Sequence, residues 1–190
     1  MKKTICIIVV IILSQILISS TLIKNPVKKR WPVKTLSDKD TILVDFKNIV
    51  KSSVHEQVSL KRPEGKINSR LTSETTVYSL DCYIIGFVKE LDRDIHVVIK
   101  DSKTEETMVV EIPIYIDDNI KNTSRYLQFK KLREWFVSNI GEPHTIFKKL
   151  KKPILVTLSG VGFWDTVHGQ KGMAANGREI HPVLTMDLKK

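Results

Sequence analysis

The stretch TTVYSLDCYIIGFVKELDRDIHVVIKDSKTEETMVVEIPI, residues 75–114, decides the fold of this chain. Three of its segments are rich in β-branched and aromatic residues, which favour strands. These segments are 75–89, 94–100 and 108–114. Two short polar stretches, 90–93 and 101–103, separate them and have the composition of turns. The stretch therefore predicts a meander of three strands joined by hairpins.

One helix and two further strands are expected after the meander. The helix is predicted between residues 123 and 140, where apolar side chains recur on one stripe. This stripe consists of Phe129, Leu132, Phe136 and Ile140. The strands are predicted at 153–164 and 179–187, with a glycine-containing loop at 165–178 between them.

This order, β-β-β-α-β-β, is that of the OB-fold, a small five-stranded Greek-key barrel. The chain is therefore predicted to be mainly β with one or two helices, and to form an OB-like barrel domain over residues 74–188. An open α+β sheet is the alternative architecture.

The region between the chain start and the barrel, residues 24–73, is expected to contain a linker and an amphipathic helix. Proline and lysine are frequent in residues 24–37, which indicates the linker. From Asp38 to Lys51 the apolar residues recur at helical spacing, which predicts a short helix there. Those apolar residues are Ile42, Leu43, Phe46, Ile49 and Val50.

The chain begins with Met1, Lys2 and Lys3, and residues 4–23 then carry no charge. A basic start followed by an apolar run is typical of a secretory signal peptide. The run is also close to the roughly 20 residues that cross a bilayer as a helix. We therefore expect residues 1–23 to be a signal peptide or a membrane anchor. The protein is then exported, either secreted or periplasmic, or tethered to the membrane through residues 4–23.

Without the leader, the chain retains a single cysteine, Cys82. It then has no disulfide partner within the mature chain, so the fold must rest on its core. About 165 residues are sufficient for a domain with such a core. Cys82 lies in an apolar run and is expected to be a buried, unreactive thiol.

The composition is basic, with 31 Lys and Arg against 21 Asp and Glu and a net charge of +10. Such a charge favours a polyanionic partner, either nucleic acid or an acidic glycan, and is also compatible with a purely solubilising role. The chain contains no glycine-rich phosphate loop and no paired-cysteine motif. Nucleotide-binding P-loop enzymes and cysteine-ligated zinc modules are therefore excluded.

The C-terminal part carries a long motif, GVGFWD at residues 160–165 followed by HGQKGMAANGREIHPVL at 168–184. Together with ELDRDIH at 90–96 and MVVEIP at 108–113, this resembles a family of exported bacterial proteins of unknown function. The resemblance spans roughly residues 60–187 and implies export, not a known activity. This chain has Ala175 where the family pattern has proline and Ile180 where it has leucine, and it lacks a cysteine that usually follows the third strand.

Polar residues gather near the ends of the predicted strands and in the loop at 165–178. The candidate binding residues are Asp94, His96, Glu111, Asp165, His168, Gln170, Asn176, Glu179 and His181. Residues two apart in a strand share a face, which relates Asp94 to His96 and Glu179 to His181.

Imidazole and carboxylate groups suit a divalent metal ion, for which His96, His168 and His181 are the candidate ligands. The same groups suit general acid–base chemistry. Alternatively, these residues only shape turns and stabilise the strands. The sequence itself requires no cofactor.

Three functions fit these features. A binding module agrees with the OB-like order, because OB barrels bind oligonucleotides or oligosaccharides. Tyr83 and Phe87 are the candidate aromatic residues for base stacking. An interaction domain of the cell envelope, with no chemistry, fits equally well. A metal-assisted, nuclease-like hydrolase that uses the histidine–carboxylate residues ranks behind both.

Overall fold

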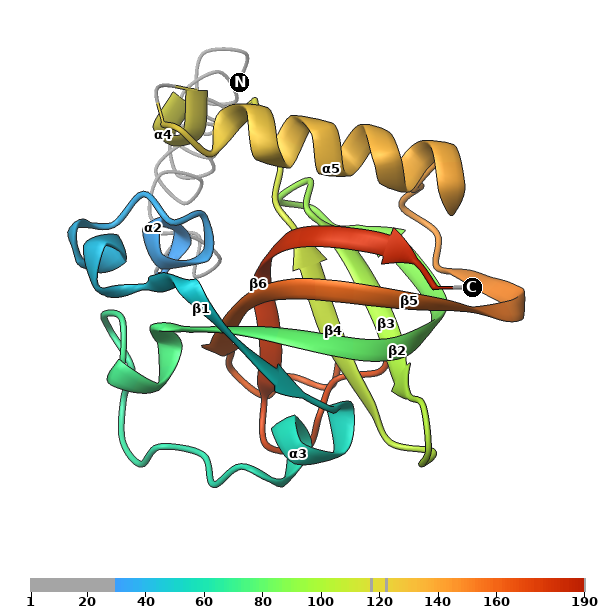
Figure 1. Cartoon of the computed structure of the whole chain (residues 1–190), viewed down its shortest axis with the longest axis horizontal. Helices are drawn as coiled ribbons and strands as arrows, with labels where there is room; N and C mark the ends of the chain where they lie inside the picture. Colours follow the sequence, from blue (N-terminus) through green and yellow to red (C-terminus); the bar gives the residue numbers. More distant parts are fainter. Residues whose placement is uncertain (1–29, 117, 122, 190) are drawn as a thin grey trace, which may run out of the picture.

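The computed structural model describes residues 30–116, 118–121 and 123–189 (Figure 1). The chain forms one six-stranded sheet with few helices, which confirms the prediction of a mainly β fold. The predicted leader at residues 1–23 and the first part of the predicted linker lie outside the described residues. Within the described part of the chain, no helix is long and apolar enough to cross a membrane.

The strands follow one another in space in the order β1-β2-β3-β4-β6-β5, and β5 also pairs with β2. Their bounds are β1 (Asp45–Ser52), β2 (Thr76–Lys89), β3 (Ile95–Asp101), β4 (Thr107–Ile112), β5 (Lys148–Trp164) and β6 (Arg178–Leu188). Hydrogen bonding therefore runs continuously around the five strands from β2 to β6. Within this ring only β4 and β6 are parallel neighbours.

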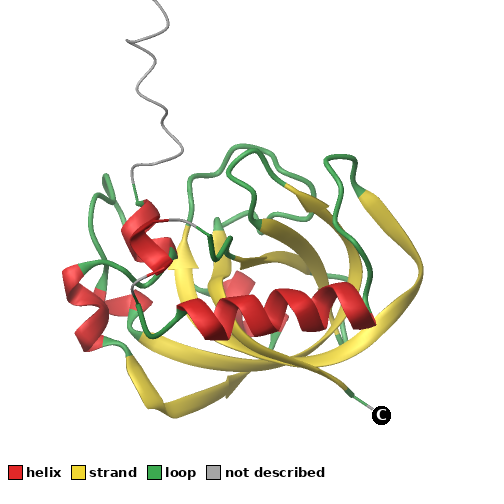
Figure 2. Cartoon of the chain, turned by 90° about the horizontal axis from the view of Figure 1, so that it is seen from above, coloured by secondary structure: helices red, strands yellow, loops and turns green. Residues whose placement is uncertain are grey.

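The helices are short except for one. They are α2 (Trp31–Lys34), α3 (Val54–Ser59), α4 (Asp118–Lys121) and α5 (Tyr126–Asn139), with 3-10 turns at Lys39–Leu43 and Thr72–Glu74. Helix α5 lies alongside the strands (Figure 2) and buries its predicted stripe against them. Its Phe136 ring meets Phe87 of β2 edge-on, with the centroids 5.1 Å apart.

The central strand β3 is buried on both of its faces. Ile95, Val97 and Ile99 point into the main apolar core, as the alternating pattern requires. His96 and Val98 point the opposite way and are buried as well. The loop between β5 and β6 covers them, since His96 Nε2 bonds to the carbonyl of Lys171 at 3.1 Å and Gly172 lies against Val98.

The helix predicted from Asp38 to Lys51 is wrong. The chain there forms a 3-10 turn and then strand β1, which pairs in parallel with residues 76–80 of β2. Strand β3 pairs with β2 only from Cys82 onward, so this part of β2 would otherwise have an open edge. Pairing with a partner distant in sequence has overridden the local helical periodicity. As a result, Ile42 and Leu43 are exposed rather than buried on a helix face.

The segment 30–37 is not a free linker, because α2 packs on the barrel and buries Trp31 and Val33. Helix α3 was not predicted, although its start is encoded in the sequence. Ser53 accepts a hydrogen bond from the backbone of Glu56, and the Glu56 side chain bonds back to the Ser53 backbone. This reciprocal capping box is a recognisable helix start. The expectation that Cys82 is a buried free thiol is confirmed.

Gly172 and Gly169 form a matched pair for testing how tightly the β5–β6 loop is seated. Both have φ near +75°, but an added Cβ meets nothing at Gly169 and meets the Val98 side chain at Gly172. We expect Gly169→Ala to lower the free energy of unfolding by about 1 kcal/mol, the cost of a left-handed backbone. Gly172→Ala should lower the free energy of unfolding by roughly 1–3 kcal/mol more than Gly169→Ala does, because the loop must move away from β3. Urea denaturation of both variants measures this, and equal losses would contradict close seating of the loop.

Candidate functional site

Five of the nine predicted site residues come together on the face of the sheet opposite the main core. They are Asp94, His96, Glu111, Glu179 and His181, and each is 0–2 % exposed. We call these five residues the buried cluster. His96 on β3 is directly opposite Glu111 on β4. Strands β4 and β6 are parallel, with Val109 opposite Glu179. This register brings Glu179 and His181 close to Glu111.

The His181 ring is surrounded by three carboxylates. Its Nδ1 lies 3.2 Å from Glu179 Oε1 and 3.4 Å from Glu111 Oε2. Its Nε2 lies 3.4 Å from Asp94 Oδ2. The other oxygen of Asp94 accepts the backbone N–H of Ile114 at 2.7 Å, which fixes the carboxylate in place. Although burial acts to lower the pKa of His181, these carboxylates raise it to about 10.

The His96 ring carries a positive charge. Its Nε2 faces the carbonyl of Lys171, which can only accept a hydrogen bond, so this nitrogen carries a proton. Its Nδ1 faces two carboxylates, Glu90 Oε1 at 3.1 Å and Glu111 Oε1 at 3.4 Å. Burial acts to lower the pKa of His96, but Glu111 and Glu90 outweigh it and raise that pKa to about 10.

Lys34 of α2 supplies a third cation, which the sequence did not suggest. Its ammonium lies 3.5 Å from Asp165 and also acts on Glu111 and Glu179. Burial opposes ionisation of Glu111, yet Lys34 and the two histidines lower the pKa of Glu111 to about 2. A lysine in a segment rich in proline and lysine is expected in solvent, so no pattern in the sequence pointed to this contact.

Three cations, Lys34, His96 and His181, face the carboxylates of the cluster and of its neighbours Glu90 and Asp165. Burial raises the pKa of Asp94 to about 6 and also raises the pKa of Glu179.

The remaining predicted residues lie around the cluster or away from it. Gln170 reaches it indirectly, by donating to Glu90 Oε1 at 2.7 Å. Asp165 bridges Lys34 and His168, and the His168 ring is 42 % exposed. His168 therefore lies apart from His96 and His181 in this structure.

Asn176 has a structural role in this fold. Its amide nitrogen has two N–H groups and lies 3.0–3.1 Å from three carbonyl oxygens, those of Gln57, Val58 and Leu60. Its oxygen accepts the backbone N–H of Arg178. It thereby ties the end of α3 to the β5–β6 loop. Glu90, by contrast, contacts the cluster through His96 and was not predicted as a site residue. It is the first residue of the ELDRDIH segment on which part of the family resemblance rests.

Comparison of the chain with models of protein families, with curated proteins and with solved structures gives no match. Its function must therefore be inferred from its own geometry.

The buried cluster is placed to hold the fold together rather than to meet a substrate. Its five residues are shielded by α2 and the β5–β6 loop. A cavity of about 410 Å³ lies elsewhere, between α5 and the turn before β3, and is lined by other residues. Through polar and charged contacts, the cluster joins α2, β3, β4, β6 and the β5–β6 loop.

Lys34 tests this structural role. We expect Lys34→Met in the full chain to lower the free energy of unfolding by roughly 3 kcal/mol, because it leaves buried carboxylates without their cation. Lys61→Met is the matched control, since Lys61 and its partner Glu64 are both 87 % exposed, and it should cause no measurable loss. Urea unfolding followed by circular dichroism measures both. A Lys34 variant as stable as the Lys61 variant would show that the cation is dispensable.

Proposed function

We propose that this chain is an exported binding module built on an OB-type barrel, and that it recognises an acidic glycan through a basic surface beside α5. In this proposal the buried cluster stabilises the module and takes no part in ligand binding. The observation that carries the proposal is the gathering of basic side chains at and beside the cavity near α5.

The ring order β2-β3-β4-β6-β5 and the place of α5 between β4 and β5 support the OB-type assignment. This is the connectivity expected of a five-stranded Greek-key barrel with a helix before its fourth strand. Strand β1 is then an addition that extends β2. Export rests on the basic start and the uncharged residues 4–23, and on the resemblance of residues 60–187 to exported bacterial proteins.

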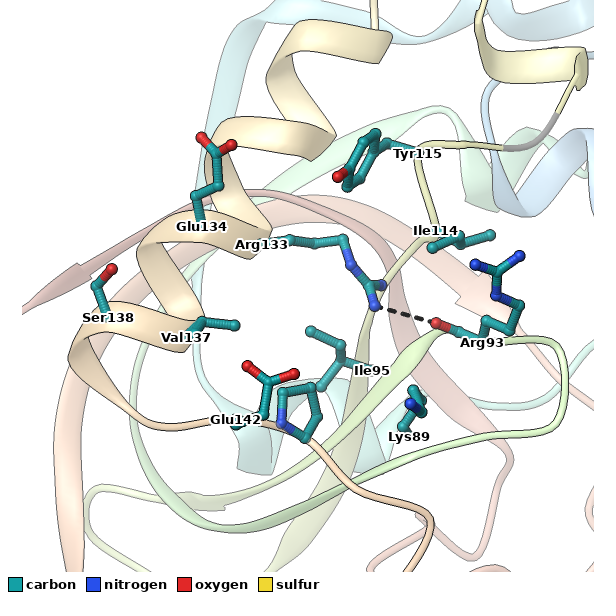
Figure 3. A pocket seen from close by; sticks show the side chains of 11 residues that line it. Lys89, Arg93, Ile95, Ile114, Tyr115, Arg133, Glu134, Val137, Ser138 and Glu142 are labelled. Carbon is teal, nitrogen blue, oxygen red and sulfur yellow. Dashed lines mark hydrogen bonds between the residues drawn. The ribbon is translucent and has the colours of Figure 1, made fainter.

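The cavity beside α5 is lined on one side by basic residues (Figure 3). Arg133 of α5 reaches across it and donates to the carbonyls of Ile112 at 2.9 Å and Arg93 at 3.1 Å, which holds the guanidinium rigidly. Lys89 at the end of β2 and Arg93 in the β2–β3 turn line the cavity, together with two carboxylates, Glu134 and Glu142. A fixed guanidinium with two further cations nearby suits an anionic group of modest size.

A run of exposed lysines begins next to this cavity, at the start of β5. The run consists of Lys148, Lys149, Lys151 and Lys152. The Lys148 ammonium lies beside Gly141, the residue before the cavity residue Glu142. Lys148 thereby connects the cavity with the run, whose side chains alternate between the two faces of β5. Such a concentration of lysines attracts an anionic polymer.

Nucleic acid fits this surface less well than an acidic glycan. Base stacking requires exposed aromatic rings. Phe87 is fully buried against Phe136, and Tyr83 is only partly exposed. A metal-assisted hydrolase also has little support, because the histidine–carboxylate cluster is closed to a substrate.

Binding of a uronic-acid oligosaccharide to the full chain in detergent tests the proposal. We expect an affinity that falls about tenfold between about 0.05 and 0.3 M NaCl, because the attraction is electrostatic. Lys148→Gln with Lys149→Gln should weaken binding. Lys61→Gln with Lys66→Gln, which removes the same charge from a distant exposed loop, should not. Isothermal titration calorimetry measures all three proteins.

Two results would contradict the proposal. One is the absence of binding at low salt. The other is tighter binding of a single-stranded oligonucleotide of equal charge, which would identify nucleic acid as the ligand.

A further inference from the structure

Four polar atoms of the buried cluster lack a hydrogen-bond partner. One is His96 Nδ1. The other three are Asp94 Oδ2, Glu111 Oε2 and His181 Nε2, which belong to adjoining side chains that are at most 2 % exposed. One ligand atom from each of the three residues lies within 4.8 Å of the others. Buried polar atoms normally have a partner, so a group of three without one requires an explanation. We propose that Asp94, Glu111 and His181 together bind one divalent metal ion of the zinc or manganese type.

The distances within the group suit a shared ion better than hydrogen bonds. His181 Nε2 lies 3.4 Å from Asp94 Oδ2, which is longer than an ordinary N–H···O bond. Ligand atoms about 2.1 Å from a tetrahedral zinc ion lie about 3.4 Å from one another. Glu111 Oε2 is unpartnered and lies 3.4 Å from the other ring nitrogen, Nδ1. The Glu111 side chain must turn toward Nε2 to complete a set of one imidazole and two carboxylates. Both zinc and manganese accept such a set.

Hydrogen bonds from neighbouring groups hold His181 and Asp94 and leave the atoms that would bind the metal free. Glu179 Oε1 bonds to His181 Nδ1 at 3.2 Å, so that Nδ1 holds the proton and Nε2 is the nitrogen available to a metal. A carboxylate behind a ligating histidine is the usual arrangement at zinc sites. The backbone N–H of Ile114 holds Asp94 Oδ1 at 2.7 Å, which directs Oδ2 toward His181.

The carboxylates of the cluster also favour a bound cation. Three of them, from Asp94, Glu111 and Glu179, lie within 3.4 Å of the His181 ring. A divalent ion bound to that ring places positive charge among them. Metal binding to an imidazole depends on pH, because the ligating nitrogen must give up its proton.

The neighbouring group of Glu90, His96 and Glu111 also has metal-ligand spacing but suits an ion less well. Its His96 ring has a proton fixed on Nε2 by the Lys171 carbonyl, and its Nδ1 lies close enough to Glu90 for an ion pair. Glu90 Oε1 is already bonded by Gln170 at 2.7 Å. His96 Nδ1 also lacks a hydrogen-bond partner, but Glu90 is 23 % exposed and its Oε1 is already occupied by Gln170, so this group offers a less enclosed set of free ligand atoms than the group around His181.

A metal ion at this position would be structural. It would join the segment before β3 to β4 and β6, in a place that solvent reaches only when the loop or α2 opens. Loading should therefore require folding in the presence of the metal, and exchange from the folded protein should be slow.

Refolding in the presence of metal tests the proposal. The full chain is unfolded with chelator, refolded in detergent with Zn²⁺ or with Mn²⁺, desalted and analysed by elemental mass spectrometry. We expect about one equivalent of one of these metals per chain and a raised melting temperature. Asp94→Asn and His181→Gln should each lower retention at least about tenfold. His55→Gln, which alters an exposed histidine–glutamate pair, should retain the metal.

The outcomes separate the proposal from trivial binding. If the wild-type chain retains neither metal, or if His55→Gln loses metal while Asp94→Asn keeps it, the site is not the one assigned here. If the His181 variant fails to fold, wild-type protein with ¹⁵N-labelled histidine decides the matter. Zn²⁺ must then shift the nitrogen signals of one buried ring and leave the exposed rings of His55, His144 and His168 unchanged.

Discussion

Glu111 occupies the position on which the rest of this structure depends. Its carboxylate is buried between His96 and His181, on the face of the sheet opposite the main core. A buried charge is tolerated only with close counter-charges and hydrogen bonds, since removal from water costs several kcal/mol. Those counter-charges come from β3, from β6 and from Lys34 of α2, so the need to compensate one carboxylate organises segments distant in the sequence.

This constraint explains why β3 has no solvent-facing side along most of its length. A charged group in a low-dielectric environment is compensated better when water is excluded, and the β5–β6 loop excludes it by lying on His96 and Val98. On the proposed OB-type barrel, that covering occupies the strands that usually receive ligands. A ligand of this protein must then bind elsewhere, and the basic surface beside α5 offers the charge to do so.

The sequence predicted β2, β3 and β4 well because β-branched and aromatic residues are dense there. It failed where pairing with a distant strand determines the structure. Strands β2, β3 and β4 and helix α5 lie within three residues of their predicted bounds. Strand β5 starts five residues before the predicted 153, because its lysine-rich beginning looks like a loop yet pairs with Gly86 and Phe87 of β2. Strand β1 was predicted as a helix for the same reason. Its own residues have helical spacing, and it is a strand because it pairs with the first half of β2.

The candidate site was predictable in its parts but not in its assembly. The two-residue spacing placed Glu179 and His181 on one face, and the adjacency of β3 and β4 placed His96 beside Glu111. No local feature of the sequence predicts that β6 pairs with β4, because this pairing follows from the closed order of the strands. Lys34 was missed for a related reason, since a lysine becomes buried only where distant carboxylates compensate it. The sequence can therefore indicate which groups carry charge, whereas the balance of charge in the site is a property of the fold.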